Sequence, residues 1–403
     1  MDDTMEQKQK INYGWIILAI FALGAFTYQM TQYQLTMVAG ELIPKLGLTE
    51  VQFSSLVTAP LVPAIALSIL VGILADKISI KLIVAIGMII SCIGGLGHIF
   101  AGTNSTFYAT MFLTGFGAVA INVTCGKIFS QWMKPTMISI AMGIFLAAST
   151  VGQFFAQSTT ALIGSMNNAF WLSGISCAIV LLLWIILGRE NKENGQAAFM
   201  EAPSFAETIK AVFASKNMWL CAIGLFFILG CQVAFNIWIP SALIAKGMDA
   251  AGAGVLASIV SLGNLTGAII MPMIAARVGK VKPFIIAFTI ICAIGYAFGW
   301  HLTGVIAYLC FFVFGFCAAS LMPFFLSMPI KFKEVGPRFV GTGMGFASTI
   351  ELLGSVLLPT YIILPLATVG KTVDFTRYFY LVGAGWIIAL VIGILIPETG
   401  NKE

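Results

Sequence analysis

The chain has 403 residues, of which 59% are hydrophobic and only 9% are charged, and its net charge is +5 at pH 7. Soluble domains contain about 25% charged residues. This composition, with a mean hydropathy of +1.00, excludes a water-soluble core and indicates a polytopic membrane protein in a lipid bilayer. The position of the basic residues, described below, argues against a nucleic-acid partner.

Twelve apolar runs are long enough for a tilted helix to cross the hydrocarbon, which needs about 17–25 residues. They must be helices, because unpaired backbone is too costly in lipid and the alternation of barrel strands is absent. The sequence therefore predicts an all-α membrane protein. The predicted spans are Tyr13–Val38, Val51–Ala75, Leu82–Ala101, Phe107–Gly126, Ile138–Ile163, Phe170–Leu187, Met218–Leu243, Gly252–Ala276, Phe284–Leu302, Gly304–Ile330, Phe339–Leu366 and Tyr378–Ile396.

The distribution of Lys and Arg predicts the orientation. An even number of spans puts both termini on one side. With that side cytoplasmic, all but four of the 21 basic residues are cytoplasmic, as the positive-inside rule requires. The four outside are Lys45, Lys246, Lys371 and Arg377. We expect a multi-pass protein of the cell membrane with an uncleaved first span.

A polar stretch near the middle of the chain predicts two domains. It covers residues 189–217, and it separates a six-helix bundle at 1–188 from a second at 218–403. The halves also resemble each other: GFGAV at Gly115 matches GFCAA at Gly315, and Ala141–Gln153 matches Gly343–Ser355. Matches near one offset of about 200 residues indicate duplication, so we expect two pseudo-symmetric bundles.

Motifs for covalent chemistry are missing from the sequence. No Walker loop, metal-ligand spacing or nucleophile–base pair is visible, so we expect neither an enzyme nor a cofactor or metal site. The eight Cys are scattered in apolar surroundings without a CxxC pair, and we expect them to act as small packing residues.

The short joint GILADKISIK connects the second and third spans and carries charge into a tight turn. It resembles the signature that the major facilitator superfamily of secondary transporters has at this position. The matching residues are Gly72, Asp76, Lys77 and Lys81. Ser79 stands where the family usually has Gly, and Ile80 where it often has Arg. The second half keeps Arg277, Gly279 and Lys280 but has Ala276 in place of the acid.

The resemblance covers the whole chain and implies alternating access, in which two bundles rock about one midplane site. It implies that Asp76 lies beside the N-terminal end of the eleventh span, near Phe339–Gly341, and holds the cytoplasmic side shut. A helix dipole would favour this carboxylate by roughly 0.3–1 kcal/mol. The alternative is that Asp76 is a solvated turn residue.

Polar side chains within the spans are candidates for substrate binding, because polar groups at this depth face the protein interior. The resemblance places them on spans that line or flank the family's cavity. Helix–helix hydrogen bonding is the alternative role. The candidates are Tyr28, Gln29, Gln32, Tyr33, Asn122, Gln153, Gln232, Asn236, Trp238 and Asn264.

One acid, Glu351, falls within a predicted span, and no Lys or Arg lies near mid-membrane. An ionisable group at this depth marks a functional site by default. Three roles stay open for Glu351: a proton carrier, the counter-charge of a cationic substrate, or a neutral packing residue held by hydrogen bonds. Its repeat partner is Ser149, so the fold does not require the acid.

The sequence thus predicts a monomeric secondary active transporter of a small organic solute, coupled to protons through Glu351. The alternative within this class is a proton-driven exporter of amphipathic or cationic compounds. It is weakened by Met111, which stands where many exporters have Arg. A membrane sensor is the alternative from another class, but we would expect a sensor to carry a soluble output domain. The substrate, the direction of transport and the stoichiometry stay open.

Overall fold

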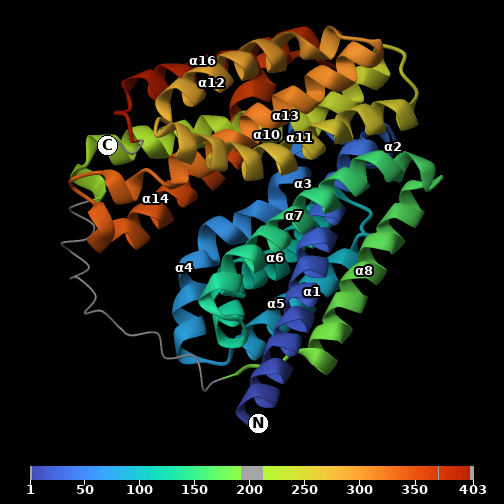
Figure 1. Ribbon diagram of the computed structural model, residues 1–403. Helices are drawn as coiled ribbons and strands as arrows, with labels where there is room; N and C mark the ends of the chain where they lie inside the picture. Colours follow the sequence, from blue (N-terminus) through green and yellow to red (C-terminus); the bar gives the residue numbers. More distant parts are fainter. Residues whose placement is uncertain (1, 192–211, 371, 400–403) are drawn as a thin grey trace. The chain divides into compact units, whose positions relative to one another are not determined.

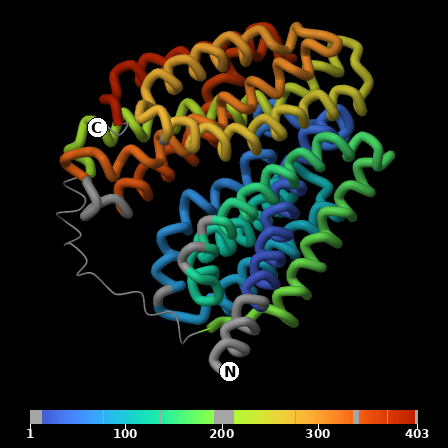
Figure 2. The backbone as a smooth tube through the Cα atoms, in the orientation of Figure 1, coloured from blue at the N-terminus to red at the C-terminus, as the bar shows by residue number. Residues whose placement is uncertain are grey.

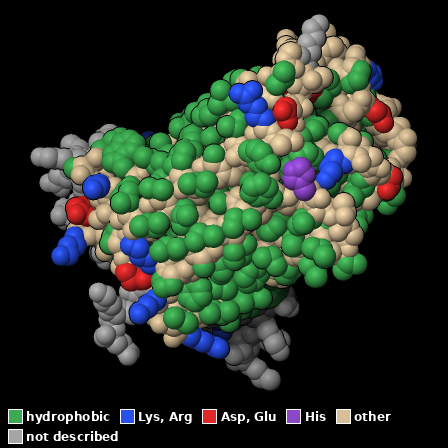
Figure 3. All heavy atoms as spheres, turned by 90° about the horizontal axis from the view of Figure 1, so that it is seen from above, with side chains coloured by type: hydrophobic (Ala, Val, Ile, Leu, Met, Phe, Trp, Pro, Cys, Tyr) green, Lys and Arg blue, Asp and Glu red, His purple; other side chains and the backbone are tan. Residues whose placement is uncertain are grey.

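The computed structural model describes the backbone of residues 2–191, 212–370 and 372–399, and in these ranges the side chains of all residues except 2–12, Asp76, 135–136, 139, Ala276 and 336–341. Twelve helices in these ranges are long and apolar enough to cross a membrane. This confirms the predicted all-α membrane fold of twelve spans. Figure 1 shows the helices in chain order, and hydrophobic side chains cover most of the face seen in Figure 3.

The described residues form two compact units: residues 2–48 with 56–191, and residues 49–55 with 212–370 and 372–399. The first half of the chain contains α1 (Asp2–Met37), α2 (Ala39–Leu46), α3 (Glu50–Thr58), η1 (Ala59–Leu61), α4 (Val62–Lys77), α5 (Ile80–Gly97), α6 (Asn104–Trp132), α7 (Pro135–Thr159), η2 (Thr160–Leu162) and α8 (Met166–Leu187). Figure 2 traces the backbone running back and forth within this half.

The second half contains α10 (Lys216–Ala245), α11 (Ala250–Val278), α12 (Lys282–Phe298), η4 (Gly299–His301), α13 (Gly304–Leu326), η5 (Pro329–Lys331), α14 (Gly336–Leu357), η6 (Leu358–Ile363), α15 (Leu364–Ala367), β1 (Thr368–Val369), β2 (Thr372–Val373) and α16 (Phe375–Leu395). The two short strands pair antiparallel, with Thr368 opposite Val373. Most of the linker at 189–217 lies outside the described residues, so the domain boundaries stay a prediction.

Proline interrupts two spans that the sequence presents as continuous apolar runs. The second span consists of α3, the 3₁₀ turn η1 and α4, with Pro60 and Pro63 at the starts of η1 and α4. The eleventh span passes from α14 into a π-helical segment, η6, with Pro359 at its start. Proline lacks the backbone N–H that would continue the α-helical ladder, which explains why the helix changes type at both places.

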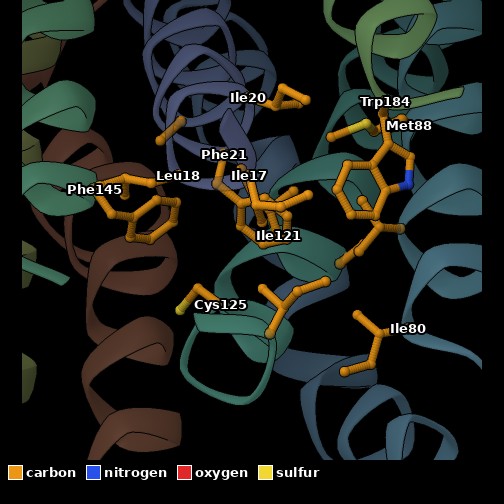
Figure 4. Close-up of a cluster of buried hydrophobic side chains, with 14 of the residues drawn as sticks. Ile17, Leu18, Ile20, Phe21, Ile80, Met88, Ile121, Cys125, Phe145 and Trp184 are labelled. Atoms are coloured by element: carbon orange, nitrogen blue, oxygen red, sulfur yellow. The ribbon is translucent and has the colours of Figure 1, made fainter. Parts of the chain in front are cut away.

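The core of the first unit is centred on Phe21 of α1. Its ring lies 5.6 Å from that of Phe129 on α6 and 5.4 Å from that of Trp184 on α8. Figure 4 shows Phe21 beside Ile17 and Ile121. Aromatic rings at these separations bury a large apolar area in defined geometry. They hold α1, α6 and α8 together.

The second unit has an equivalent aromatic core around Phe235 of α10. Its ring lies 4.6 Å from Tyr296 on α12 and 5.4 Å from Phe379 on α16. Tyr296 in turn lies 5.2 Å from the ring of Trp386 on α16. These contacts fix α12 and α16 on one side of α10.

Two helix crossings occur at equivalent positions of the two halves, and both depend on glycine. A Cβ at Gly152 of α7 would clash with the backbone of Phe26 on α1, and a Cβ at Gly354 of α14 would clash with the backbone of Phe226 on α10. The paired positions are 202 and 200 residues apart. Small residues let helix backbones approach closely in lipid. The halves therefore share the packing of their first and fifth spans.

The sequence repeat at Gly115 and Gly315 is also a repeat of contacts. A Cβ at Gly115 of α6 would clash with the carbonyl of Pro60, and a Cβ at Gly315 of α13 would clash with the carbonyl of Val260 on α11. The fourth span of each half thus packs on its second span at a glycine. Recurrence of both contacts agrees with two pseudo-symmetric six-helix bundles.

We expect Gly152→Ala to destabilise the protein, because the added methyl group has no room at the α1–α7 crossing. Overpacking of this kind costs about 1–3 kcal/mol. The matched control is Gly143→Ala on the same helix, where the methyl group would meet nothing within 4 Å. Thermal unfolding in detergent should show a lower Tm for Gly152→Ala alone. Equal Tm values for the two variants would contradict the close crossing.

A buried histidine closes the end of α5, immediately after the third span. His98 is 2% exposed, its ring stacks on Phe107 at 5.1 Å, and it lies 5.9 Å from the ring of Phe170. Among the described residues, neither ring nitrogen has a hydrogen-bond partner. Burial lowers the pKa of His98 from 6.5 to about 3, so the folded protein holds this imidazole neutral.

This burial predicts a pH-dependent loss of stability. Below about pH 6.5 the unfolded chain takes up a proton at His98 that the folded protein does not, so stability falls by about 1.4 kcal/mol per pH unit down to the folded pKa. When the pH is lowered from 7.5 to 5, the Tm of His98→Phe should fall by less than the Tm of wild type. His301→Phe is the control, since that side chain is exposed. Parallel acid sensitivity in wild type and His98→Phe would refute the assignment.

Candidate functional site

The polar face predicted on the first span divides between two environments. Tyr28 belongs to the packed core of the first unit, where its hydroxyl lies against Gly117 of α6. Tyr33 packs in a separate cluster with Met30 and with Ala156 of α7. The structure therefore does not bring Tyr28 and Tyr33 together, and both rings are buried.

Two glutamines of α1 differ in how their amides are used. Gln32 donates a hydrogen bond from Nε2 to the carbonyl oxygen of Val57 at 3.0 Å, which ties α1 to the end of α3. Gln29 is half-buried, and its Oε1 has no partner among the described residues. An unused buried acceptor is costly unless a ligand or water completes it. Gln29 is thus the better-placed candidate for a solute.

The fifth span offers a second unused amide. Gln153 of α7 is buried, and its Nε2 lacks a partner among the described residues. It directly follows Gly152, where α7 touches Phe26 of α1, and Gln29 lies about one turn beyond Phe26. The crossing therefore places an unused donor and an unused acceptor near the same level of α1 and α7.

Asn122 is less suited to a buried site. It is exposed on α6, and its Nδ2 donates to the carbonyl oxygen of Ala118 on the same helix at 2.8 Å. The side chain thus uses its donor on a carbonyl of its own helix.

In the second unit, α10 presents polar residues on two faces. Gln232 and Asn236 are buried one turn apart, and Gln232 donates from Nε2 to the carbonyl oxygen of Ala318 on α13 at 3.4 Å. Trp238 points elsewhere: its ring lies 5.6 Å from that of Phe53 and 6.3 Å from that of Tyr378. The structure brings Gln232 and Asn236 together and separates Trp238 from them.

Asn264 lies on α11 at its close contact with α13. Its Oδ1 has no partner among the described residues, and the same holds for the hydroxyl of Ser261, one turn earlier. A Cβ at Gly315 of α13 would come within 3.1 Å of the backbone nitrogen of Asn264. Unused polar atoms therefore gather where α11 and α13 approach each other.

Glu351 of α14 is a buried carboxyl group without a partner among the described residues. It is 8% exposed, and no described residue forms a hydrogen bond or ion pair with it. The Cys221 thiol of α10 lies within electrostatic range. A buried carboxylate without a counter-ion is unfavourable, so this group is stable when it holds a proton or meets a cation.

Glu351 and the polar residues of α10 lie at different depths. Glu351 precedes Gly354 by three residues, and Gly354 packs on Phe226 of α10. Gln232 follows Phe226 by six residues. Because a helix rises about 1.5 Å per residue, Glu351 lies roughly 14 Å from the level of Gln232. The carboxyl is therefore not in the same polar cluster as Gln232 and Asn236.

The joint between the second and third spans is a two-residue link between α4 and α5. Ser79 is the N-cap of α5, with its hydroxyl accepting from the backbone N–H of Leu82. Lys77 and Lys81 are exposed, and Gly72 lies in open surroundings where a Cβ would meet only Val123 at 3.8 Å. The side chain of Asp76 and those at 339–341 lie outside the described residues. The predicted contact between Asp76 and the start of the eleventh span therefore stays a prediction.

Glu190, which follows α8, holds this joint. Its Oε1 accepts from the backbone N–H of Lys81 at 2.6 Å and from the hydroxyl of Ser79 at 3.1 Å. A carboxylate at a helix N-terminus satisfies orphan N–H groups and complements the dipole. Ser79, where the family usually has Gly, thus caps α5 and also bonds Glu190.

The second unit repeats the arrangement with different residues. Arg277 is exposed in the last turn of α11, and Gly279 ends that helix with a φ of 71°. Glu398, which follows α16, accepts from the backbone N–H of Val281 at 2.9 Å and of Lys282 at 3.2 Å. An acid after the last span of each half thus caps the third span.

Sequence reasoning missed Glu190 and Glu398, as well as the buried amide of Gln34, whose Oε1 accepts a hydrogen bond from Ser173 of α8. The two acids follow the sixth and twelfth spans about 208 residues apart. This spacing, close to the repeat offset, is the signal that could have identified them. For Gln34 the sequence offers no such spacing, and only its position as a polar residue within a span distinguishes it.

A family model described as the Major Facilitator Superfamily matches residues 16–359. The chain belongs to this superfamily. The members of this family are transporters and not enzymes, so this chain is a multi-pass membrane transporter of small solutes.

Three similar proteins illustrate the range of relatives. An uncharacterised transporter of Bacillus subtilis, YycB, is 26% identical over 71% of this chain and 70% of its own. The solved structure of the nucleoside transporter NupG has a TM-score of 0.76 at 16% identity and covers 94% of this chain and 98% of its own. The D-xylose–proton symporter has a TM-score of 0.72 at 16% identity, covering 97% and 100%. The two structures show that the fold is shared.

We expect Glu190→Ala to destabilise the protein, because it leaves the N–H of Lys81 without its acceptor. Loss of a helix cap costs about 0.5–2 kcal/mol. Glu398→Ala should behave alike in the second unit. Glu41→Ala is the control, an exposed acid on α2. The measurement is thermal unfolding in detergent, and a Glu190→Ala variant as stable as Glu41→Ala would show that the cap contributes nothing.

Proposed function

We propose that this transporter moves a small organic solute by alternating access and couples its movement to protons through Glu351. The observation that carries the proposal is the buried carboxyl of Glu351, which has no counter-ion or hydrogen bond among the described residues. A carboxyl in this setting gains or loses a proton according to how far each conformation exposes it to water. That property is what a proton carrier needs.

The depth of Glu351 supports indirect coupling. It lies on the other side of the α10–α14 crossing from Gln232 and Asn236, so a solute held by these amides does not have to touch the carboxyl. Coupling then arises because the solute and the proton each favour one conformation over the other. This arrangement resembles linkage between two sites rather than direct competition for one.

The polar set indicates an uncharged or cationic solute. Apart from the packed rings of Tyr28, Tyr33 and Trp238, the candidate residues on α1, α7, α10 and α11 are amides, which donate and accept hydrogen bonds without net charge. Among the described residues no Lys or Arg lies in the middle of a span to bind a carboxylate. A sugar, an amino compound or a similar hydroxylated solute fits this set better than a dicarboxylate.

The joint residues Gly72, Asp76, Lys77 and Lys81, with Arg277 in the second half, take the gating role in this proposal. Glu190 and Glu398 support it, because they fix the helix ends from which these charges project. The excess of basic residues on the side of the termini supports a cytoplasmic location for both ends in the cell membrane. The transporter works as a monomer.

Glu351→Gln should abolish proton-driven accumulation and spare exchange of solute across the membrane, because the amide keeps the volume but cannot release a proton. A thermal-shift screen of amines, amino acids, monocarboxylates and sugars first identifies the solute. Uptake into proteoliposomes is then measured with and without a pH gradient. Glu41→Gln, at an exposed acid, is the matched control.

Unchanged uphill transport by Glu351→Gln would remove this residue from the coupling role. A different outcome, in which the solute is a cation and Glu351→Gln fails to bind it, would favour the alternative of a proton-driven exporter of cationic compounds. If Glu351→Gln still binds and exchanges the solute, Glu351 serves in proton coupling. If binding is lost, Glu351 serves as the counter-charge of a cationic solute.

A further inference from the structure

The surface of the second unit holds an apolar groove between α12 and α16. Its volume is about 380 Å³, and residues lining it include Ile294, Phe298, Tyr380, Gly383, Ala384 and Ile387. Five of these six are at least partly exposed, and all lie in membrane-spanning helices. The groove therefore faces the hydrocarbon of the bilayer.

Small residues form the floor of this groove. A Cβ at Gly383 would clash with the Cβ of Ala297, so α12 and α16 touch along this line. Ile294 and Ile387 rise on either side and are 59% and 54% exposed. A floor of Gly and Ala between walls of branched side chains makes a narrow trough, which fits an extended hydrocarbon chain.

Aromatic rings mark the end of the groove where α12 ends and α16 begins. The rings of Phe298 and Tyr380 lie 5.3 Å apart at an interplanar angle of 57°. Both side chains are large and exposed, and Tyr brings a hydroxyl to this end. Tyrosine is enriched at the level of lipid headgroups, where one end of the side chain is apolar and the other is wet.

A cationic side chain, Arg377, lies at the same end of the groove. Arg377 is exposed one turn before Tyr380, and His301 is exposed three residues after Phe298. Lys246 donates from Nζ to the carbonyl oxygen of Trp300 at 3.0 Å and lies 4.9 Å from the centre of its ring. In Figure 3 an exposed histidine lies beside a basic side chain.

The acid nearest in sequence to Arg377 is already engaged. Asp374 is the N-cap of α16, and its Oδ1 accepts from the backbone N–H of Arg377 at 3.1 Å. Among the described residues the guanidinium of Arg377 has no hydrogen-bond or ion-pair partner, and its planar fork suits phosphate. An anionic group at this end of the groove would be favoured by charge.

We propose that the groove between α12 and α16 binds one acyl chain of an anionic phospholipid, with the phosphate at Arg377. The trough supplies apolar contact, and the cationic end supplies selectivity for the headgroup. In the proposed orientation the lipid belongs to the outer leaflet. The site is independent of Glu351 and of the solute.

A second copy of this chain is a poorer occupant. A symmetric dimer through this face would use the same patch on both subunits, and it would bring Arg377 close to Arg377 of the other copy at the same depth. Like charges placed opposite each other oppose association. A lipid with a negative headgroup removes that repulsion.

The test is native mass spectrometry of the full chain in detergent with phosphatidylglycerol or phosphatidylcholine of identical acyl chains. Wild type should retain one phosphatidylglycerol more tightly than phosphatidylcholine. Ala384→Trp fills the trough and should weaken retention of both lipids at least about tenfold, since each excluded methylene removes a sizeable part of the affinity. Arg377→Gln should abolish the preference for phosphatidylglycerol over phosphatidylcholine. The contact between the acyl chain and the groove should remain.

Two controls match these variants. Ile388→Trp adds the same ring at an exposed position of α16 that does not line the groove. Lys45→Gln removes an exposed cation from the first unit. Both should retain lipid like wild type. Equal retention of the two lipids by wild type, or unchanged retention by Ala384→Trp and Arg377→Gln, overturns the proposal. So does a wild-type dimer that Ala384→Trp dissociates, which would assign the groove to a second copy.

Discussion

Close contact between helix backbones at glycine is the constraint on which each half of this transporter depends. Lipid tails are as apolar as leucine, so helices in a membrane gain little from hydrophobic association and rely on close packing. Gly152 and Gly354 provide that packing at equivalent crossings, against Phe26 and Phe226. Two of the candidate site residues take their depth in the membrane from these crossings. Gln153 follows one of them directly, and Glu351 lies one turn before the other.

The crossing of α10 and α14 also separates two kinds of chemistry. On one side is the carboxyl of Glu351, which has no partner in the part of the chain that the structure describes, and on the other are the amides of Gln232 and Asn236. A direct mechanism would need the solute and the proton to share groups. In the mechanism that we propose, the two are instead linked through the conformation of the helices, which requires only that each ligand favour one state.

The ends of the third span in each half show how one structural need is met by different residues. α5 begins at a serine cap with Glu190 behind it, whereas α12 begins after Gly279 with Glu398 behind it. In both halves a carboxylate bonds free N–H groups beside a run of basic side chains. The charges of the joint are therefore held on a fixed frame. If the joint acts as a gate, its charges need a fixed position, because a charge on a frayed helix end would not be held against its partner.

The sequence by itself determined the fold class, the number of spans and the internal repeat, because length and hydropathy suffice to identify helices that must satisfy their backbone in lipid. It also identified Glu351, since an acid within a span stands out by composition alone. Only the tertiary structure decided which polar side chains keep unused atoms. Gln32 and Gln29 look alike in the sequence, yet Gln32 is bonded to Val57 while the Oε1 of Gln29 has no partner among the described residues. Tyr28 and Trp238 likewise proved to be packed among other rings and helices. These differences arise from contacts between residues far apart in the chain, which local pattern does not encode.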